Sequence, residues 1–159
     1  MGTIIIPLDK SHDVASFTSP STDLNRWLQT TARQHQSKSL SKTFVLIDTE
    51  QPTVVRGFYA LAIRQMMPRD DMPPALTKRL PLNIPGYTLA RLAVAAHATG
   101  HGYGADLLVD AIDKVTAATA NVGGPFLFVD AKDLDAAAFY RHFGFTPFPS
   151  DPLTLVMSI

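Results

Sequence analysis

Cysteine is absent from the 159-residue sequence, and so is any long apolar run. Without cysteine the protein has no disulfide, no thiol nucleophile and no thiolate metal ligand. No apolar stretch approaches the roughly 18 residues that a membrane-spanning helix needs, and the opening MGTIIIPLDK lacks the basic flank and cleavage site of an export signal. The composition therefore predicts a cytoplasmic protein that does not contact a membrane.

A net charge is also absent, because 14 Lys and Arg balance 14 Asp and Glu. The two signs are unevenly distributed: the chain up to Arg91 holds eleven basic and seven acidic residues, and the remainder holds three and seven. A basic half is typical of nucleic-acid surfaces, although an excess of this size is weak support by itself. The length predicts one domain spanning residues 1–159.

Hydrophobic periodicity and turn residues predict strands and helices in alternation. We expect strands at Ile4–Leu8, Thr43–Ile47, Val54–Ile63, Thr88–Val94, Phe126–Val129, Phe145–Phe148 and Leu153–Ile159. We expect helices from Thr22 to about Gln36, from Gly104 to the Asn121–Gly124 region, and at Asp133–Phe143. This order predicts an α+β fold, a mixed α/β sandwich of helices on one sheet.

Several helix ends carry recognisable capping residues. Ser21 or Thr22 is expected to cap the N-terminus of the first helix, and Asp133 that of the last. Gly144 follows the last helix, where a left-handed residue is expected. The first helix should leave Arg33 on its solvent side, and the second should leave Asp110 there.

The segment Met66–Pro85 differs from the rest of the chain. It holds five prolines together with charged residues of both signs. Prolines at this density predict a surface excursion, with at most one short helix near Pro74–Arg79.

A glycine run, ATGHGYG at Ala98–Gly104, stands between a predicted strand and a predicted helix. Gly100, Gly102 and Gly104 free the backbone to aim several N–H groups outward at a helix N-terminus, which is a favourable arrangement for an anion. The run alone leaves two interpretations open, an anion site and a tight connection without a ligand.

Two other phosphate motifs fit the run less well. A P-loop needs a lysine directly after its last glycine, and the first lysine after this run is Lys114. Gly100, Gly102 and Ala105 fit the dinucleotide fingerprint G-x-G-x-x-A, but that motif follows the first strand and expects an acidic residue about 20 positions later, where Gly124 stands. The dinucleotide interpretation remains as a less favoured alternative.

The run RLAVAAHATGHGYGADLL, followed by a helix, a strand and FYRHFGF, resembles the GNAT acetyltransferases in motif order and spacing. The pyrophosphate motif of that family, Gln/Arg-x-x-Gly-x-Gly/Ala, falls on Thr99, Gly102 and Gly104. Both glycines match. Thr99 departs from the usual Gln or Arg, and Ala96 and His97 replace a pair that is often basic.

Stretches from FTSPSTDLNRWLQTTARQHQ (Phe17–Gln36) to AAAFYRHFGFTPF resemble the GNAT-type toxins of bacterial toxin–antitoxin modules over nearly the whole chain. The resemblance implies a mostly antiparallel central sheet with helices on both faces. It implies acetyl-CoA as co-substrate and acetylation of the amino group of aminoacyl-tRNA, which blocks translation. It also implies a ribbon-helix-helix antitoxin as partner.

The resemblance further assigns roles to residues. The pantetheine arm would pair with the backbone of Leu92 and Val94, and the pyrophosphate would bind main-chain N–H groups of the loop. Tyr140 would donate a proton to the departing thiolate or position the attacking amine. The full set of implied cofactor-binding residues is Leu92, Ala93, Val94, Thr99, Gly100, His101, Gly102, Tyr103, Gly104 and Ala105.

The acceptor and its RNA are less well defined. An α-amino group, with a reference pKa near 8, is partly neutral at pH 7 and needs no strong base, which favours aminoacyl-tRNA over a lysine side chain. Arg91 lies on the strand proposed to hold the cofactor, where a charge needs a partner. Candidates for phosphate contacts are Arg33, Lys38, Lys42, Arg64, Arg69, Lys78, Arg79 and Arg91.

Other possibilities stay open. His97 and His101 have no carboxylate beside them, so we expect no metal. A GNAT enzyme that acetylates a small amine or a protein N-terminus is one alternative. A catalytically weak acetyl-CoA-binding partner of a DNA-binding antitoxin is another, and the sequence leaves open whether the chain forms a homodimer.

Overall fold

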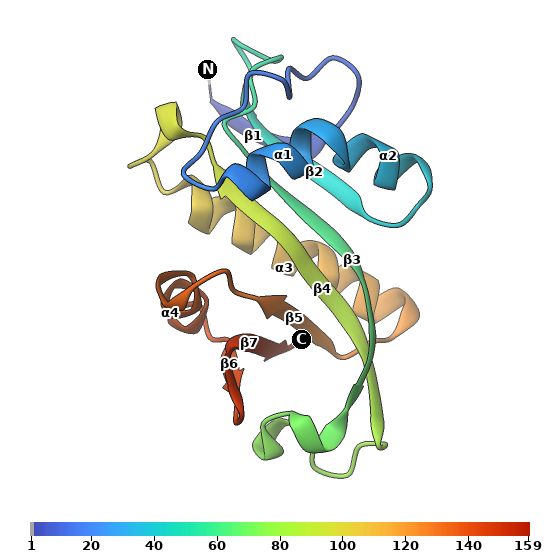
Figure 1. The fold of residues 1–159 in the computed structure, drawn as a ribbon. Coiled ribbons are helices and arrows are strands. Elements are labelled where there is room, and N and C mark those ends of the chain that lie inside the picture. Colours follow the sequence, from blue (N-terminus) through green and yellow to red (C-terminus); the bar gives the residue numbers. More distant parts are fainter. Residues whose placement is uncertain (1) are drawn as a thin grey trace. The chain divides into compact units, whose positions relative to one another are not determined.

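The structure is a computed structural model that describes residues 2–159 (Figure 1). This part of the chain forms seven strands and four α-helices, with short 3-10 turns η1–η3. The strands are β1 (Thr3–Pro7), β2 (Lys42–Asp48), β3 (Gly57–Pro68), β4 (Asn83–Val94), β5 (Phe126–Asp130), β6 (Thr146–Phe148) and β7 (Asp151–Ser158). The helices are α1 (Thr22–Thr30), α2 (Ala32–Ser37), α3 (Tyr103–Val122) and α4 (Leu134–His142).

The strands form one mixed sheet in the hydrogen-bonded order β1-β2-β3-β4-β5-β7-β6. The predicted fold class, an α+β sandwich with a mostly antiparallel sheet, is confirmed. Only β4 and β5 run parallel among the strand pairs that the register describes. The chain divides into two compact units, Met1–Ala62 with Ala90–Ala111, and Ile63–Leu89 with Ile112–Ile159.

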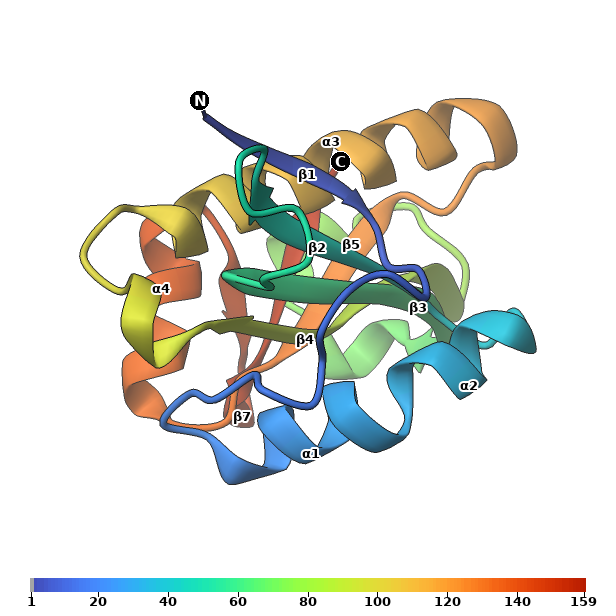
Figure 2. The same cartoon turned by 90° about the horizontal axis from the view of Figure 1, so that it is seen from above.

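The first unit is built on the antiparallel strands β1, β2 and β3. Ile4 pairs with Ile47, and Val45 pairs with Phe58. Figure 2 shows α1 and α2 along one face of these strands and the start of α3 along the opposite face. Leu28 of α1 is buried in one core with Val45 and Phe58, so burial of apolar side chains holds the α1 face to the sheet.

The second unit is built on β5, which pairs with β4 on one side and with β7 on the other. The short strand β6 pairs with the outer side of β7. Phe126 and Phe128 of β5 and Val156 of β7 are buried in one core, together with Met72 from the segment between β3 and β4. This core holds that segment in place.

Three predicted helix ends are confirmed. The Ser21 hydroxyl accepts a hydrogen bond from the Leu24 N–H at 3.2 Å, so Ser21 is the N-cap of α1. The Asp133 carboxylate accepts one from the Ala136 N–H at 2.8 Å at the start of α4. Gly144 has a φ of +100° directly after the C-cap of α4, a conformation that favours glycine.

The predicted continuous helix to Gln36 was wrong, because the chain breaks at Thr31, where φ is −124°. The hydroxyl of Thr30 bonds back to the carbonyl of Arg26 at 2.7 Å. Such threonine bonds to the preceding turn bend helices, and two β-branched residues in succession weaken the turn further.

The predicted excursion Met66–Pro85 was too long. β3 runs on to Pro68 and β4 begins at Asn83, so the two strands are longer than expected at this end. The Arg69 N–H donates to the Leu82 carbonyl at 2.8 Å, which continues the backbone pairing past the end of β3. Proline is compatible with a strand end, where its missing N–H costs no ladder bond. At the other end, β3 begins at Gly57 rather than Val54.

No helix in residues 2–159 is long and apolar enough to span a membrane.

Gly86 opens the parallel pairing of β4 with β5, opposite Phe126. A Cβ at Gly86 would lie 2.7 Å from the Phe126 carbonyl oxygen and 2.7 Å from the Phe128 ring. We expect Gly86→Ala to lower the free energy of unfolding by about 1 to 3 kcal/mol, because the added methyl group meets backbone that cannot rotate away. Urea unfolding measures the change, and Asn83→Ala, an exposed change on the same strand, should stay within about 0.5 kcal/mol. Equal stability of the two variants would contradict the close approach.

Candidate functional site

The glycine loop follows β4 in the first unit and is anchored at its start. The Ala95 N–H donates to the Arg56 carbonyl, and the Ala96 N–H donates to the Thr18 carbonyl, each at 2.8 Å. The short turn η3 (Ala96–Ala98) leads into the glycines, and the buried Ala98 belongs to the core of this unit. The loop therefore starts from a fixed point at the end of β4.

Gly100 and Gly102 both adopt left-handed backbone, with φ of +83° and +75°. A Cβ built at either glycine would have no atom within 4 Å. The space beside both residues is thus open to a ligand. The left-handed conformation disfavours any residue with a side chain, so the local backbone explains why glycine stands at both positions.

Helix α3 begins directly after these glycines. Its first residues, Tyr103, Gly104 and Ala105, have backbone N–H groups that lack an acceptor within the helix, and the Asp106 N–H makes the first bond, to the Gly102 carbonyl at 3.1 Å. Unpaired N–H groups and the helix dipole together favour an anion at this position. Open space and donors make this loop a fitting place for a pyrophosphate.

The last part of β4 offers free backbone on one side. The parallel pairing of β4 with β5 ends at Leu89, opposite Val129, whereas β4 itself continues to Val94. Ala93 is buried in the core of the first unit, and Leu92 and Val94 are half-buried. Backbone groups past Leu89 on the β5 side are consequently left outside the described ladder, where an extended ligand can pair with them.

Tyr140 lies in α4 of the second unit and is 7% exposed. Its ring packs edge-on against Phe139 and Phe145, with centroid distances of 5.4 and 5.6 Å. Burial raises the pKa of Tyr140 to about 12. The hydroxyl forms no hydrogen bond with any residue from 2 to 159, and it is not among their fully buried unpaired atoms, so it is available to a ligand.

The polar side chains of the loop are exposed. Thr99, His97 and His101 all face solvent, and the His101 ring stacks on Tyr103 with a centroid distance of 5.3 Å. Within residues 2–159 there is no group of three or more histidine or acidic side chains arranged to hold a metal ion. The backbone is therefore the main source of donors that this loop offers a ligand.

Arg91, for which a site or salt-bridge role was expected, forms no salt bridge within residues 2–159 and contacts an aromatic ring instead. Its guanidinium lies over the Trp27 ring, 5.1 Å from the centroid, and it donates to the Ala90 carbonyl at 2.6 Å. Trp27 in turn stacks on Phe58, which belongs to the core of the first unit. A cation over an aromatic face is attracted by the ring quadrupole, which accounts for a charge on this strand.

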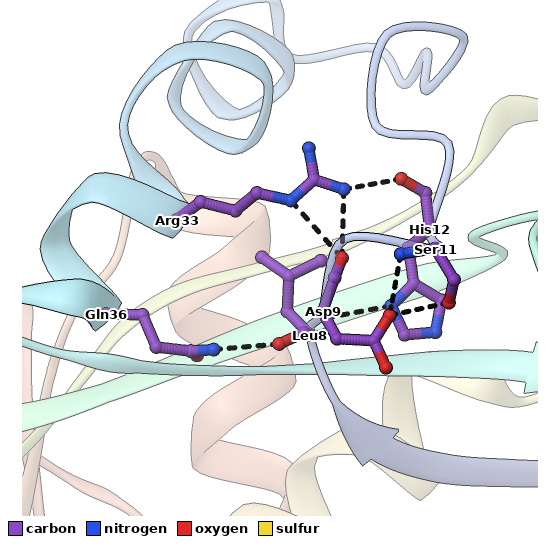
Figure 3. Close-up of polar contacts among 6 residues, drawn as sticks. All are labelled: Leu8, Asp9, Ser11, His12, Arg33 and Gln36. Carbon is purple, nitrogen blue, oxygen red and sulfur yellow. Dashed lines mark hydrogen bonds and ion pairs between the residues drawn. The ribbon is translucent and has the colours of Figure 1, made fainter.

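Arg33 does not stand free on the solvent side of its helix, as expected, but holds the loop after β1 (Figure 3). Its guanidinium donates to the Asp9 carbonyl at 3.0 Å and to the His12 carbonyl at 2.6 Å. Gln36 beside it donates to the Leu8 carbonyl at 2.8 Å. These bonds tie α2 to the loop, and they make Arg33 a poor candidate for a phosphate contact.

The same loop fixes a buried histidine. His12 is 3% exposed, and its Nδ1 accepts a hydrogen bond from the Asp9 N–H at 3.0 Å. Hydrogen bonds from Ser11 lower the pKa of the Asp9 carboxyl below its usual value. The cluster is a structural support for the first unit.

Arg64 and Arg69 are also engaged. Arg64 forms a two-pronged ion pair with Asp130, at 2.7 and 3.1 Å, and lies over the Phe128 ring. Arg69 donates to the Leu80 carbonyl at 2.9 Å. The remaining candidates, Lys38, Lys42, Lys78 and Arg79, are exposed.

One polar pair of the first unit was not predicted from the sequence. The Tyr59 hydroxyl, on a fully buried ring of β3, donates to the Asp110 carboxylate of α3 at 2.6 Å. Helical periodicity placed Asp110 on the solvent side, and it is half-buried instead. No spacing in the sequence indicates this pair, because its members lie on elements far apart in the chain.

No family model matches the chain. The tRNA-acetylating toxin of Mycobacterium tuberculosis is 35% identical over 150 residues, which cover 94% of this chain and 88% of that protein. The structure of AtaT complexed with acetyl-methionyl-tRNAfMet covers 99% of this chain and 95% of its own, with a TM-score of 0.90 and 28% identity.

A further solved structure is an AtaT toxin with a tyrosine-to-phenylalanine substitution, bound to the C-terminus of the antitoxin AtaR and to acetyl-CoA. It has a TM-score of 0.81 and 27% identity, and covers 98% of this chain and 92% of its own. The mixed sheet, the glycine loop and these likenesses define a GNAT-type acetyltransferase. Within that class, the chain belongs to the tRNA-acetylating toxins of toxin–antitoxin modules.

The raised pKa of Tyr140 predicts a dependence of stability on pH. The folded protein keeps the phenol proton up to about pH 12, whereas the unfolded chain releases it near pH 10. The stabilisation is therefore complete below pH 10 and is lost as the pH rises towards 12. At pH 11 the wild-type protein should have lost about 1.4 kcal/mol that Tyr140→Phe does not lose. Urea unfolding of both proteins at pH 8 and pH 11 measures this, and equal losses would contradict the assignment.

Proposed function

We propose that the protein transfers the acetyl group of acetyl-CoA to the α-amino group of aminoacyl-tRNA and so blocks translation. The observation that carries the proposal is the glycine loop at the start of α3, where open space, two left-handed glycines and unpaired N–H groups suit a pyrophosphate. The names of the relatives support the acceptor, since one is a tRNA-acetylating toxin and another was solved with acetyl-methionyl-tRNAfMet.

Acetyl-CoA would supply an activated acetyl group as a thioester. The residues that would hold it are the backbone of Thr99 to Ala105 at the pyrophosphate and the backbone of Leu92 and Val94 along the pantetheine arm. Thr99 replaces the basic or amide residue usual in the motif, so main-chain donors at the helix N-terminus must provide the attraction. Ala93 contributes through packing, because its side chain is buried in the core.

Tyr140 would act as the hydrogen-bond donor to the departing sulfur. With a pKa of about 12 it stays protonated at any pH at which the enzyme works. Complete transfer of its proton to a thiolate with a pKa near 8.5 would be uphill by roughly 3.5 units, or about 5 kcal/mol. Tyr140 would therefore stabilise the developing charge by donating a hydrogen bond, and the proton taken up by the thiolate would come from the attacking amine or from water.

No general base is required for the attacking amine. An α-amino group has an ordinary pKa near 8, so part of it is neutral at pH 7. A lysine side chain, with a pKa near 10.4, would depend much more on a base. Tyr140 forms no hydrogen bond with a histidine or a carboxylate among residues 2–159, which is compatible with an α-amino acceptor.

The proposed partner in the cell is an antitoxin. The relative AtaT was solved with the C-terminus of its antitoxin AtaR, and we extend this arrangement to a ribbon-helix-helix antitoxin for the present chain. Both the toxin and its aminoacyl-tRNA substrate would meet in the cytoplasm.

Transfer itself is tested with labelled acetyl-CoA and tRNAs charged with single amino acids. The account predicts label on at least one aminoacyl-tRNA, in a bond that resists the mild base that hydrolyses the ester to tRNA. The absence of transfer to every charged tRNA, from a protein that binds acetyl-CoA, would overturn the proposal. Label on free amines or peptides alone would instead favour a different acceptor.

Tyr140→Phe should lower the rate constant of acetyl transfer by at least about a hundredfold, because it removes the donor at the leaving group. Affinity for acetyl-CoA should not change. Tyr87→Phe is the matched control, since the Tyr87 hydroxyl only donates to the Gly123 carbonyl at 2.7 Å. Single-turnover kinetics with both variants separates an effect on the rate constant of transfer from an effect on acetyl-CoA affinity. Equal rate constants for the two variants would contradict a role of Tyr140 in the transfer.

Gly102→Ala tests the pyrophosphate loop. The added methyl group would occupy the space beside the loop and strain the left-handed backbone, so affinity for acetyl-CoA should fall at least about tenfold. Gly123→Ala is the control, because Gly123 also has a positive φ, +95°, and also has no atom within 4 Å of a built Cβ. Both changes should cost about 1 kcal/mol of stability, and only Gly102→Ala should weaken binding in calorimetry.

A further inference from the structure

The segment between β3 and β4 in the second unit forms a small pocket. The turns η1 (Arg69–Asp71) and η2 (Pro74–Leu76) build it, and its volume is about 340 Å³. Two backbone hydrogen bonds within this segment fix its shape: the Thr77 N–H donates to the Pro74 carbonyl, and the Leu80 N–H donates to the Thr77 carbonyl. Met72, which is 1% exposed, packs into the core beneath it. The pocket is thus a built feature and not a loose loop.

A threonine side chain with no hydrogen-bond partner in the described chain lines this pocket. Thr77 is 5% exposed, and its side chain forms no hydrogen bond with the described part of the chain, residues 2–159. The Thr77 hydroxyl is not among the fully buried, unpaired side-chain atoms of residues 2–159, so it is open to the pocket that Thr77 lines. It is therefore available to donate a hydrogen bond to a polar ligand there.

Two cations line the same pocket without an ion pair of their own. Lys78 and Arg79 both line it and are exposed, and neither forms an ion pair with any residue from 2 to 159. Arg79 has a φ of +63°, a left-handed conformation that is unfavourable for a residue with a long side chain. Strained backbone of this kind is found at ligand sites more often than elsewhere.

Arg69 adds a third positive charge to the pocket. One of its nitrogens donates to the Leu80 carbonyl, and its Nε lies 3.5 Å from the Asp70 carboxylate. Asp70 is the one acidic residue of the lining, and its side chain is 82% exposed, so water weakens this pair. The net charge of the lining side chains is therefore positive.

We propose that this pocket binds a backbone phosphate of the tRNA, with Lys78 and Arg79 as charged contacts and the Thr77 hydroxyl as a donor to a phosphate oxygen. The lining contains no aromatic side chain on which a base could stack, so the contact is with the backbone and is independent of sequence. The inference rests on the proposed function for the identity of the RNA and adds the site that positions it.

Binding of uncharged tRNA to the full chain, measured by fluorescence anisotropy at several salt concentrations, tests the proposal without any acetyl transfer. Lys78→Gln and Arg79→Asn should each weaken binding about five- to tenfold at low salt and lower the slope of log K against log salt by roughly one. Asparagine is chosen at position 79 because it tolerates left-handed backbone. Thr77→Val should weaken binding severalfold and leave the salt slope unchanged.

Lys10→Gln and Arg26→Gln are the matched controls, since both remove an exposed cation elsewhere on the chain. The proposal is overturned if the pocket variants bind tRNA as the controls do, with the same salt slope. The proposal is also overturned if the pocket variants lose affinity for duplex DNA but keep their affinity for tRNA. Loss of tRNA affinity in a protein that acetylates no aminoacyl-tRNA would support the pocket and reject the proposed reaction. Pocket variants that acetylate aminoacyl-tRNA fully, with an unchanged KM for tRNA, would support the proposed reaction and reject the pocket.

Discussion

The left-handed backbone at Gly100 and Gly102 is the constraint on which the proposed chemistry depends. These two residues, separated by His101, lie between the end of β4 and the start of α3, and the space beside both is open. A dipole and several donors then act on one small volume. In the proposed site the attraction for the pyrophosphate comes from the backbone, which is not altered by threonine at position 99 in place of a basic or amide residue.

The chemistry of Tyr140 follows from its surroundings in the second unit. Its aromatic neighbours, Phe139 and Phe145, exclude water, and this exclusion is what raises its pKa. A phenol with a pKa of about 12 is a weak acid that keeps its proton and can donate a hydrogen bond. The combination suits stabilisation of a developing negative charge and argues against a simple transfer of the proton.

The sequence predicted the elements with local signals and missed the features set by contacts between distant elements. Ser21, Asp133 and Gly144 act within a few residues, so their roles could be recognised from the chain alone. The break at Thr31 and the extension of β4 to Asn83 depend on tertiary context, which periodicity does not report. Arg33 illustrates the same limit, because its partners lie in a loop more than twenty positions earlier in the chain. Arg91 was anticipated to need a partner, but only the fold could identify that partner as Trp27.

The most direct test of the central claim is the effect of acetyl-CoA on the backbone amides of the protein, observed by two-dimensional ¹H–¹⁵N NMR. A chain of 17.3 kDa is well suited to the measurement. The account predicts that the largest changes in chemical shift fall on Gly100 to Ala105 and on Leu92 and Val94. Binding of acetyl-CoA that leaves the amides of Gly100 to Ala105 unchanged would contradict it.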